Sequence, residues 1–90
     1  MSLGEALKSF LKAYNLEDKL NEKRLIASWE QVTGKLVAKH TISLYIKNKI
    51  LYARLDSAAL RNELSYAREK LVKSLNEQVQ AEVIREVVFT

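Results

Sequence analysis

The spacing of apolar residues in the first third of the chain predicts helices. Apolar side chains recur every three or four positions over residues 3–14, which indicates an amphipathic helix that Asn15 is expected to end. The same spacing predicts a second helix over about 19–33, with Trp29 on its apolar stripe and therefore in the core. Gly34 then falls where a left-handed residue often ends a helix.

The hydrophobic period changes from helical to alternating after a short extra turn expected over residues 35–39. In the segments TISLYIK and ILYARL, apolar and polar residues alternate. This predicts an antiparallel hairpin of two strands joined by a four-residue loop, 47–50. The loop pairs Ile46 with Leu51, Leu44 with Ala53, and Ile42 with Leu55. Because all six residues are apolar, one face of the hairpin is expected to be buried.

The other face of the predicted hairpin is polar and aromatic. The same register places Tyr45 opposite Tyr52, and Ser43 opposite Arg54. Aromatic side chains on a sheet can stack unpaired bases, and an arginine can add a phosphate contact. The two tyrosines can also serve as a cross-strand pair that stabilises the hairpin, or as anchors of a protein interface. All three interpretations stay open at the level of sequence.

The last third of the chain predicts one long helix and a third strand. The dipeptide Asp56-Ser57 supplies a helix N-cap, and a leucine stripe extends over about 58–76, where Asn76 is expected to end the helix. The segment EVIREVVF predicts a strand over about 83–89. The order α-α-β-β-α-β predicts a single α+β domain over residues 1–90, with a three-stranded sheet and helices packed mainly on one face.

The composition argues against enzymatic and metal-binding chemistry. The chain has no cysteine and a single histidine, His40, so neither a thiol nucleophile nor a zinc site of three soft ligands can be built. Its two glycines, thirty residues apart, cannot form a phosphate-cradling loop. We therefore predict no catalytic residue, no metal and no cofactor, and interpret His40 as a structural residue ahead of a strand.

The sequence carries no signal for a membrane or for export. No apolar run approaches the roughly 18–20 residues that cross a bilayer, and the N-terminal segment lacks the hydrophobic region of a signal peptide. The absence of cysteine fits a reducing compartment. A cytoplasmic protein is therefore expected. Residues 1–3 are compatible with an expression-vector remnant and carry no weight in these expectations.

The distribution of charge is more informative than the net charge of +4. No acidic residue lies between Glu30 and Asp56, while this window carries five basic residues beside His40. They are Lys35, Lys39, Lys47, Lys49 and Arg54. Coulomb attraction and counterion release draw phosphates to such a region, so these residues are candidates for weak DNA binding. An equally good interpretation is that strands disfavour acidic residues and that lysines at turns keep sheet edges soluble.

Two arginines of the predicted long helix extend the candidate set. Arg61 and Arg68 lie seven positions apart, hence on one stripe away from the leucines. Such a stripe can face an anionic partner, although a solvated polar face is the commoner outcome. The predicted nucleic-acid-binding set therefore comprises Lys35, Lys39, Lys47, Lys49, Arg54, Arg61 and Arg68, with Tyr45 and Tyr52 as stacking or partner contacts.

Several short motifs occur in a combination that resembles one protein family. Trp29 is followed five residues later by Gly34, and the stretch AKHTISLYIKNKILYARLDSAALRNEL comes next. The ordered motifs are Lys39-His40-Thr41, Leu51-Tyr52, Asp56-Ser57, Arg61-Asn62-Glu63-Leu64 and Leu75-Asn76-Glu77. Together with the VIREVVF strand they resemble the DciA-type domain of bacteria, from about Leu20 to Phe89.

This resemblance implies properties that the residues alone do not show. Family members act with the DnaB-type replicative helicase and help to load or operate it at replication origins. Their folded domain is similar to a K-homology fold, they bind DNA, and they have no ATPase activity of their own. The short single-domain form is similar to versions from Bacteroidetes-like bacteria. The implied function is a non-catalytic DNA-replication accessory domain that binds the helicase and, weakly, DNA.

Two departures from the family pattern bear on this expectation. Longer members carry a flexible C-terminal extension that contacts the helicase, whereas this sequence stops at Thr90, so helicase binding would use the domain itself. The Gly-x-x-Gly clamp of K-homology RNA binders is absent, and a single helix between the second and third strands would offer no loop to hold it.

Two alternative functions also fit the residues. The first is a general nucleic-acid-binding module of K-homology type without a helicase role. The second is a protein–protein or self-association module, because the domain size and an open sheet edge permit a homodimer.

Overall fold

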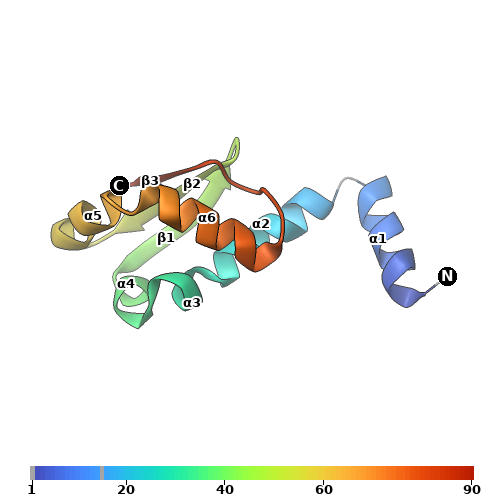
Figure 1. Ribbon diagram of the computed structural model, residues 1–90, viewed down its shortest axis with the longest axis horizontal. Coiled ribbons are helices and arrows are strands. Elements are labelled where there is room, and N and C mark those ends of the chain that lie inside the picture. Colours follow the sequence, from blue (N-terminus) through green and yellow to red (C-terminus); the bar gives the residue numbers. More distant parts are fainter. Residues whose placement is uncertain (1, 15) are drawn as a thin grey trace.

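The computed structural model describes residues 2–14 and 16–90, and its first helix stands apart from the rest. Helix α1 (Leu3–Ala13) begins at Ser2, whose hydroxyl accepts a hydrogen bond from the backbone N–H of Glu5 (3.1 Å). None of its residues is buried, and it projects from one end of the molecule (Figure 1). The helix predicted here is present, while Asn15, expected to end it, lies outside the described residues.

The second helix predicted from the sequence is divided in two. Helix α2 (Glu17–Ala27) and helix α3 (Trp29–Thr33) are separated at Ser28, so the prediction of one continuous helix was wrong. The Ser28 hydroxyl donates to the carbonyl of Leu25 (2.7 Å), a local bond that competes with helix continuation. Trp29, the first residue after the break, is buried in the core as predicted.

Gly34 joins α3 to another short helix, α4 (Lys35–Lys39), which confirms the extra turn expected there. The φ angle of Gly34 is positive (93°), as expected at a helix end, but its ψ angle of 167° is extended rather than left-handed helical. This combination is accessible essentially to glycine alone. Gly34 therefore redirects the chain instead of forming the predicted left-handed cap.

Strands β1 (Thr41–Lys47) and β2 (Ile50–Leu55) form the predicted antiparallel hairpin. Its loop has two residues instead of the predicted four, because the pairing continues one step further toward the tip. Asn48 and Lys49 both have positive φ angles (52° and 62°), which is what a type I′ two-residue hairpin loop requires. The predicted register is confirmed for four pairs: Ser43–Arg54, Leu44–Ala53, Tyr45–Tyr52 and Ile46–Leu51.

The register departs from the prediction at the open end of the hairpin. A bulge makes Thr41, not Ile42, the partner of Leu55, and Ile42 is 57% exposed. Two hydrogen bonds of the Thr41 hydroxyl explain the shift. This hydroxyl donates to the carbonyl of Val37 (2.7 Å) and accepts from the indole N–H of Trp29 (3.0 Å). An inward polar anchor at Thr41 therefore replaces the expected apolar pair.

The long helix predicted after the hairpin is also broken. Helix α5 (Ala58–Ser65) is capped by Ser57, as predicted, and helix α6 (Arg68–Val79) begins after a short turn. The prediction of a single helix was therefore wrong, and the turn between the two helices carries no Gly-x-x-Gly sequence. Because they lie on different helices, Arg61 and Arg68 do not share one helical stripe.

Asn76 lies inside α6 instead of ending it, and the helix stops at the left-handed residue Gln80 (φ 54°, ψ 38°). The side-chain amide oxygen of Asn76 accepts hydrogen bonds from the backbone N–H groups of Val83 (3.0 Å) and Ile84 (3.1 Å). Its amide nitrogen donates to the carbonyl of Ile84 (2.8 Å). These bonds hold the segment that was predicted to begin the third strand, and strand β3 covers only Glu86–Phe89.

The sheet has the strand order β1-β2-β3, with β2 antiparallel to β1 and parallel to β3. Helices α2, α3 and α6 lie against one face of it (Figure 1). The core between these layers consists of Leu25, Trp29, Val37, Leu51, Ala53, Leu75, Val79, Ile84 and Val87. The predicted α+β class, with three strands and helices mainly on one face, is confirmed.

Candidate interaction surface

The sheet face opposite the helices is the principal candidate site. Side chains alternate between the two faces of a sheet, and residues paired across strands share a face. Since Leu51, Ala53 and Val87 belong to the core, their neighbours along the strands point away from it. The register assigns nine residues to this side, which we call the open sheet face: Ser43, Tyr45, Lys47, Ile50, Tyr52, Arg54, Glu86, Val88 and Thr90.

Tyr45 and Tyr52 occupy the centre of the open sheet face. Their ring centroids are 4.8 Å apart and the ring planes differ by 13°, so the rings are stacked. Each ring therefore turns one face toward the other ring, while Tyr45 remains 53% exposed. The predicted pairing is confirmed, and the stack itself stabilises the hairpin. A role of these rings in binding a base or a partner stays a prediction.

A shallow hollow of about 490 Å³ lies beside the tyrosines. It is lined by Ser43, Tyr45, Tyr52, Arg54 and Thr90. Thr90 continues the pairing of the sheet here, since its N–H donates to the carbonyl of Ala53 and its carbonyl accepts from the N–H of Leu55, both at 3.0 Å. The hollow thus offers aromatic surface, hydroxyl groups and one guanidinium, a set that suits a polar or anionic group of a partner.

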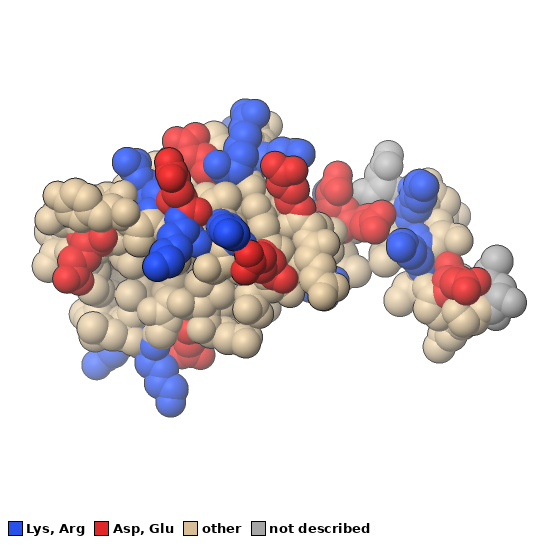
Figure 2. Space-filling view, in the orientation of Figure 1, with Lys and Arg blue, Asp and Glu red and all other residues tan. Residues whose placement is uncertain are grey.

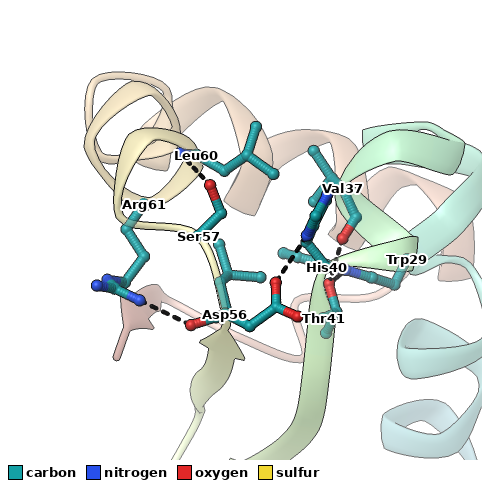
Figure 3. A network of polar contacts seen from close by, with 9 residues as sticks. Trp29, Val37, His40, Thr41, Asp56, Ser57, Leu60 and Arg61 are labelled. Atoms are coloured by element: carbon teal, nitrogen blue, oxygen red, sulfur yellow. Dashed lines mark hydrogen bonds and ion pairs between the residues drawn. The ribbon is translucent and has the colours of Figure 1, made fainter.

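A polar network closes the base of the hairpin (Figure 3). Nδ1 of His40 lies 2.7 Å from Oδ1 of Asp56, and the backbone N–H of Asp56 donates to the carbonyl of His40 (3.0 Å). Arg61 reaches back from α5 and donates through Nη1 to the carbonyl of Leu55 (2.7 Å). The His40–Asp56 contacts tie the start of β1 to the end of β2, and the Arg61 bond ties α5 to β2, so His40 and Arg61 both have structural partners within the chain.

The seven predicted DNA-facing cations do not form one patch. They fall into three groups: Lys35, Lys39, Arg54 and Arg61 near the base of the hairpin, Lys47 and Lys49 at its tip, and Arg68 at the start of α6. A polynucleotide would have to follow the length of the hairpin to contact the first two groups. The role of each of these residues stays a prediction.

Carboxylates line the same hollow as one of these cations. Lys49 lines a small hollow of about 120 Å³ together with Asp18, Glu22 and Glu82. Over the helix side of the molecule, basic and acidic side chains are interspersed (Figure 2). The window without acidic residues in the sequence therefore does not make the hairpin tip uniformly positive, because α2 and the segment before β3 bring carboxylates to it.

The fold also forms a groove that the sequence did not predict. It lies between strand β3 and the turn that joins α5 to α6, with a volume of about 560 Å³. Its lining residues are Ser65, Tyr66, Arg68, Glu69, Val72, Arg85, Glu86 and Val87. Tyr66 is 84% exposed, and Nε of Arg68 donates to the carbonyl of Ser65 (3.1 Å). The helix break and the parallel pairing of β3 create this groove, and neither leaves a plain signal in the sequence.

No helix among the described residues combines the length and apolarity that a bilayer-spanning helix requires. Within residues 2–14 and 16–90, no three potential ligands come together as a metal site would need. Over the same ranges, one side-chain ion pair is found, between Nδ1 of His40 and Oδ1 of Asp56.

Comparison with known proteins identifies the family. A family profile described as "Dna[CI] antecedent, DciA" matches residues 2–89, nearly the whole chain. No curated protein sequence matches the chain significantly. The matched family consists of accessory proteins of the helicase-loader type, is associated with the DnaB helicase in replication, and is not a known enzyme family. The resemblance suggested by the sequence motifs is thereby confirmed, and the chain belongs to the DciA family.

Proposed function

We propose that this domain is a non-catalytic accessory module of DNA replication that binds the DnaB-type replicative helicase and, weakly, DNA. Membership of the DciA family supports the helicase part, because the family is associated with that helicase. The open sheet face supports a mode of binding, since no helix of residues 2–14 and 16–90 covers the aromatic pair at its centre.

The observation that carries the proposal is the chemistry of the open sheet face. Lys47 and Arg54 lie on either side of the stacked tyrosines along the strands, and Glu86 is the one acidic residue among the nine. Tyrosine and arginine are among the side chains that most often anchor protein interfaces. We therefore assign the helicase contact to this face, with Tyr45, Tyr52 and Arg54 as its anchors.

The proposed DNA contact is electrostatic and weak. Lys35 and Lys39 lie one turn apart on α4, and Lys49 at the hairpin tip lines a hollow together with three carboxylates. Few phosphates can therefore be neutralised at once. Affinity should fall with salt, with a log–log slope near −0.7 per neutralised phosphate on single strands and near −0.9 on duplex.

Capture by the organism's own replicative helicase tests the protein contact. The double variant Tyr45→Ala, Tyr52→Ala should bind at least about tenfold more weakly, because it removes the two central anchors. Tyr66→Ala is the matched control, since Tyr66 is exposed but lies outside the open sheet face. Equal capture of both variants by the helicase would show that the contact lies outside the open sheet face. If the helicase does not capture the wild-type chain, the proposed helicase contact is wrong.

A salt titration of DNA binding tests the electrostatic part. Charge reversal at Lys35 and Lys39 should reduce the salt slope by about two units while helicase capture persists. Lys8 and Lys12 provide a matched control, because they have the same spacing on α1 and are not in the predicted set. A flat slope for the wild-type chain would remove DNA from the proposal and leave a protein-binding module.

One observation favours a second candidate, a nucleic-acid-binding module without a helicase role. The groove beside β3 places the exposed ring of Tyr66 next to Arg68 and Arg85, and an aromatic ring with cations can hold a single strand. Salt-dependent binding that Tyr66→Ala weakens, together with no helicase capture, would support this alternative.

A further inference from the structure

Helix α1 and its C-cap residue Tyr14 carry a row of large apolar side chains that remain mostly exposed among the described residues. Leu3 is 88% exposed, Leu7 56%, Phe10 53% and Tyr14 67%. No residue of α1 is buried, and the helix lies away from the sheet and its core (Figure 1). The family profile begins at residue 2, so this row belongs to the family domain. An exposed apolar row of this size marks an interaction surface.

The spacing of the row is that of a helix-pairing seam. The four residues are separated by four, three and four positions, which is the alternation of the two core positions of a heptad. The positions that flank the seam are all small or apolar: Gly4, Ala6, Leu11 and Ala13. The polar residues Glu5, Lys8, Ser9 and Lys12 fall on the remaining positions, away from the seam.

We propose that α1 is a self-association element that pairs with α1 of a second copy of this chain in antiparallel orientation. The flanking positions usually carry charges that select a different partner helix. Here they carry none, so two identical copies can approach without like-charge repulsion at the seam. The small side chains of Gly4, Ala6 and Ala13 also allow the two backbones to come close.

The antiparallel orientation follows from the order of side-chain sizes. Aliphatic residues lie in the first half of the seam and aromatic residues in the second half. Antiparallel pairing puts Leu3 against Tyr14 of the second copy, and Leu7 against Phe10, so every layer combines a smaller with a larger side chain. Parallel pairing would instead put each side chain against the same residue of the second copy, for example Leu3 against Leu3 and Tyr14 against Tyr14. It would also bring the sheet-containing parts of two chains, each chain with an overall net charge of +4, to the same end of the pair.

The size of the seam predicts a weak, reversible dimer. Four large apolar side chains from each copy remove on the order of 1,000 Å² from water, which is near the lower limit for a specific interface. We therefore expect a dissociation constant in the micromolar range, on the order of 10–100 µM, rather than an obligate dimer. This pairing of α1 helices requires neither the proposed helicase contact nor the proposed DNA contact.

Sedimentation equilibrium of the full chain over about 1–500 µM tests the pairing. The wild-type chain should show a monomer–dimer equilibrium, and Leu7→Glu should weaken it by at least about tenfold because a carboxylate would enter the seam. Ser9→Glu adds the same charge on the opposite side of α1 and should leave the equilibrium unchanged. Because Leu7 makes no core contact, the far-ultraviolet circular dichroism of both variants should match the wild type.

Disulfide trapping tests the orientation, since the chain has no cysteine of its own. In an equimolar mixture of Leu7→Cys and Phe10→Cys chains, antiparallel pairing should give mainly the mixed disulfide, identified by mass. Mainly self-linked chains would overturn the antiparallel orientation. A chain that stays monomeric throughout, or a dimer indifferent to Leu7→Glu, would overturn the pairing itself. Loss of helicase capture by Leu7→Glu in a monomeric chain would assign α1 to the helicase instead.

Discussion

Gly34 shows how one residue can set the direction of the chain. Its φ of 93° and ψ of 167° turn the backbone from α3 into α4, the last helix before the hairpin. A residue with a Cβ pays about 1–3 kcal/mol to adopt this region. The presence of Gly34 was readable from the sequence, but its exact conformation was not, because ψ depends on where α4 packs.

We expect Gly34→Ala to lower the free energy of unfolding by about 1–3 kcal/mol. A Cβ at this position meets no atom within 4 Å, so the cost comes from the backbone conformation and not from a clash. Urea unfolding followed by the fluorescence of Trp29 measures it. Gly4→Ala in the exposed helix α1 is the control and should change the value by less than about 0.5 kcal/mol. Equal effects of the two substitutions would contradict the explanation.

Other single residues were predictable only in part. Ser57 was correctly identified as a cap, because a cap bonds to the backbone of its own helix start. Thr41 and Asn76 were not, because their hydrogen-bond partners lie on other elements or beyond the helix end. When the tertiary structure determines which group a side chain bonds to, no local sequence pattern predicts that hydrogen bond.

The hairpin was the best-predicted element because alternation fixes both of its faces at once. A one-residue slip would have moved every apolar residue to the wrong face, so most of the register could be read from the sequence. The helices were predicted less well. Their apolar period runs through Ser28 and through the turn between α5 and α6 without interruption, and the breaks arise from local hydrogen bonds such as that of Ser28.

The hairpin loop holds a conformational cost that can be removed. Lys49 has a φ of 62°, a left-handed conformation that side chains other than asparagine and glycine disfavour. We expect Lys49→Gly to raise the free energy of unfolding by up to about 1 kcal/mol, because Asn-Gly is the preferred two-residue loop. Thermal unfolding by calorimetry measures the change. Lys47→Gly, within β1, should have the opposite sign, and a loss of stability in both variants would contradict this account.

At the scale of the whole molecule, the α+β fold class and the open sheet face were predictable from the sequence. The groove between β3 and the turn joining α5 to α6 was not. The order of elements and the alternation of the strands determine which face the helices leave uncovered. The groove requires the parallel pairing of β3 with β2, whose Cα partners Ile50 and Glu86 are far apart in sequence. Long-range pairings of this kind are decided by the packing of α6, and single-sequence patterns do not record them.

The free energy of unfolding should depend mainly on the core between the sheet and helices α2, α3 and α6, and little on α1. Leu75 is fully buried in the core, whereas Leu7 makes no core contact. We expect Leu75→Ala to lower the free energy of unfolding by about 2–5 kcal/mol, and Leu7→Ala to change it by less than about 0.5 kcal/mol. Chemical denaturation at about 1 µM protein keeps self-association out of the measurement. A cost for Leu7→Ala comparable to that of Leu75→Ala would mean that α1 packs on the core of its own chain.

The parallel pairing of β2 with β3 also determines the order in which the domain can be completed during translation. The hairpin can close as soon as residue 55 has left the ribosome, but β2 lacks its second neighbour until residues 86–89 follow. At about 5–20 residues per second this interval lasts a few seconds. Throughout it, one edge of the central strand is uncovered. The nascent chain therefore exposes a backbone edge that the finished domain covers with β3.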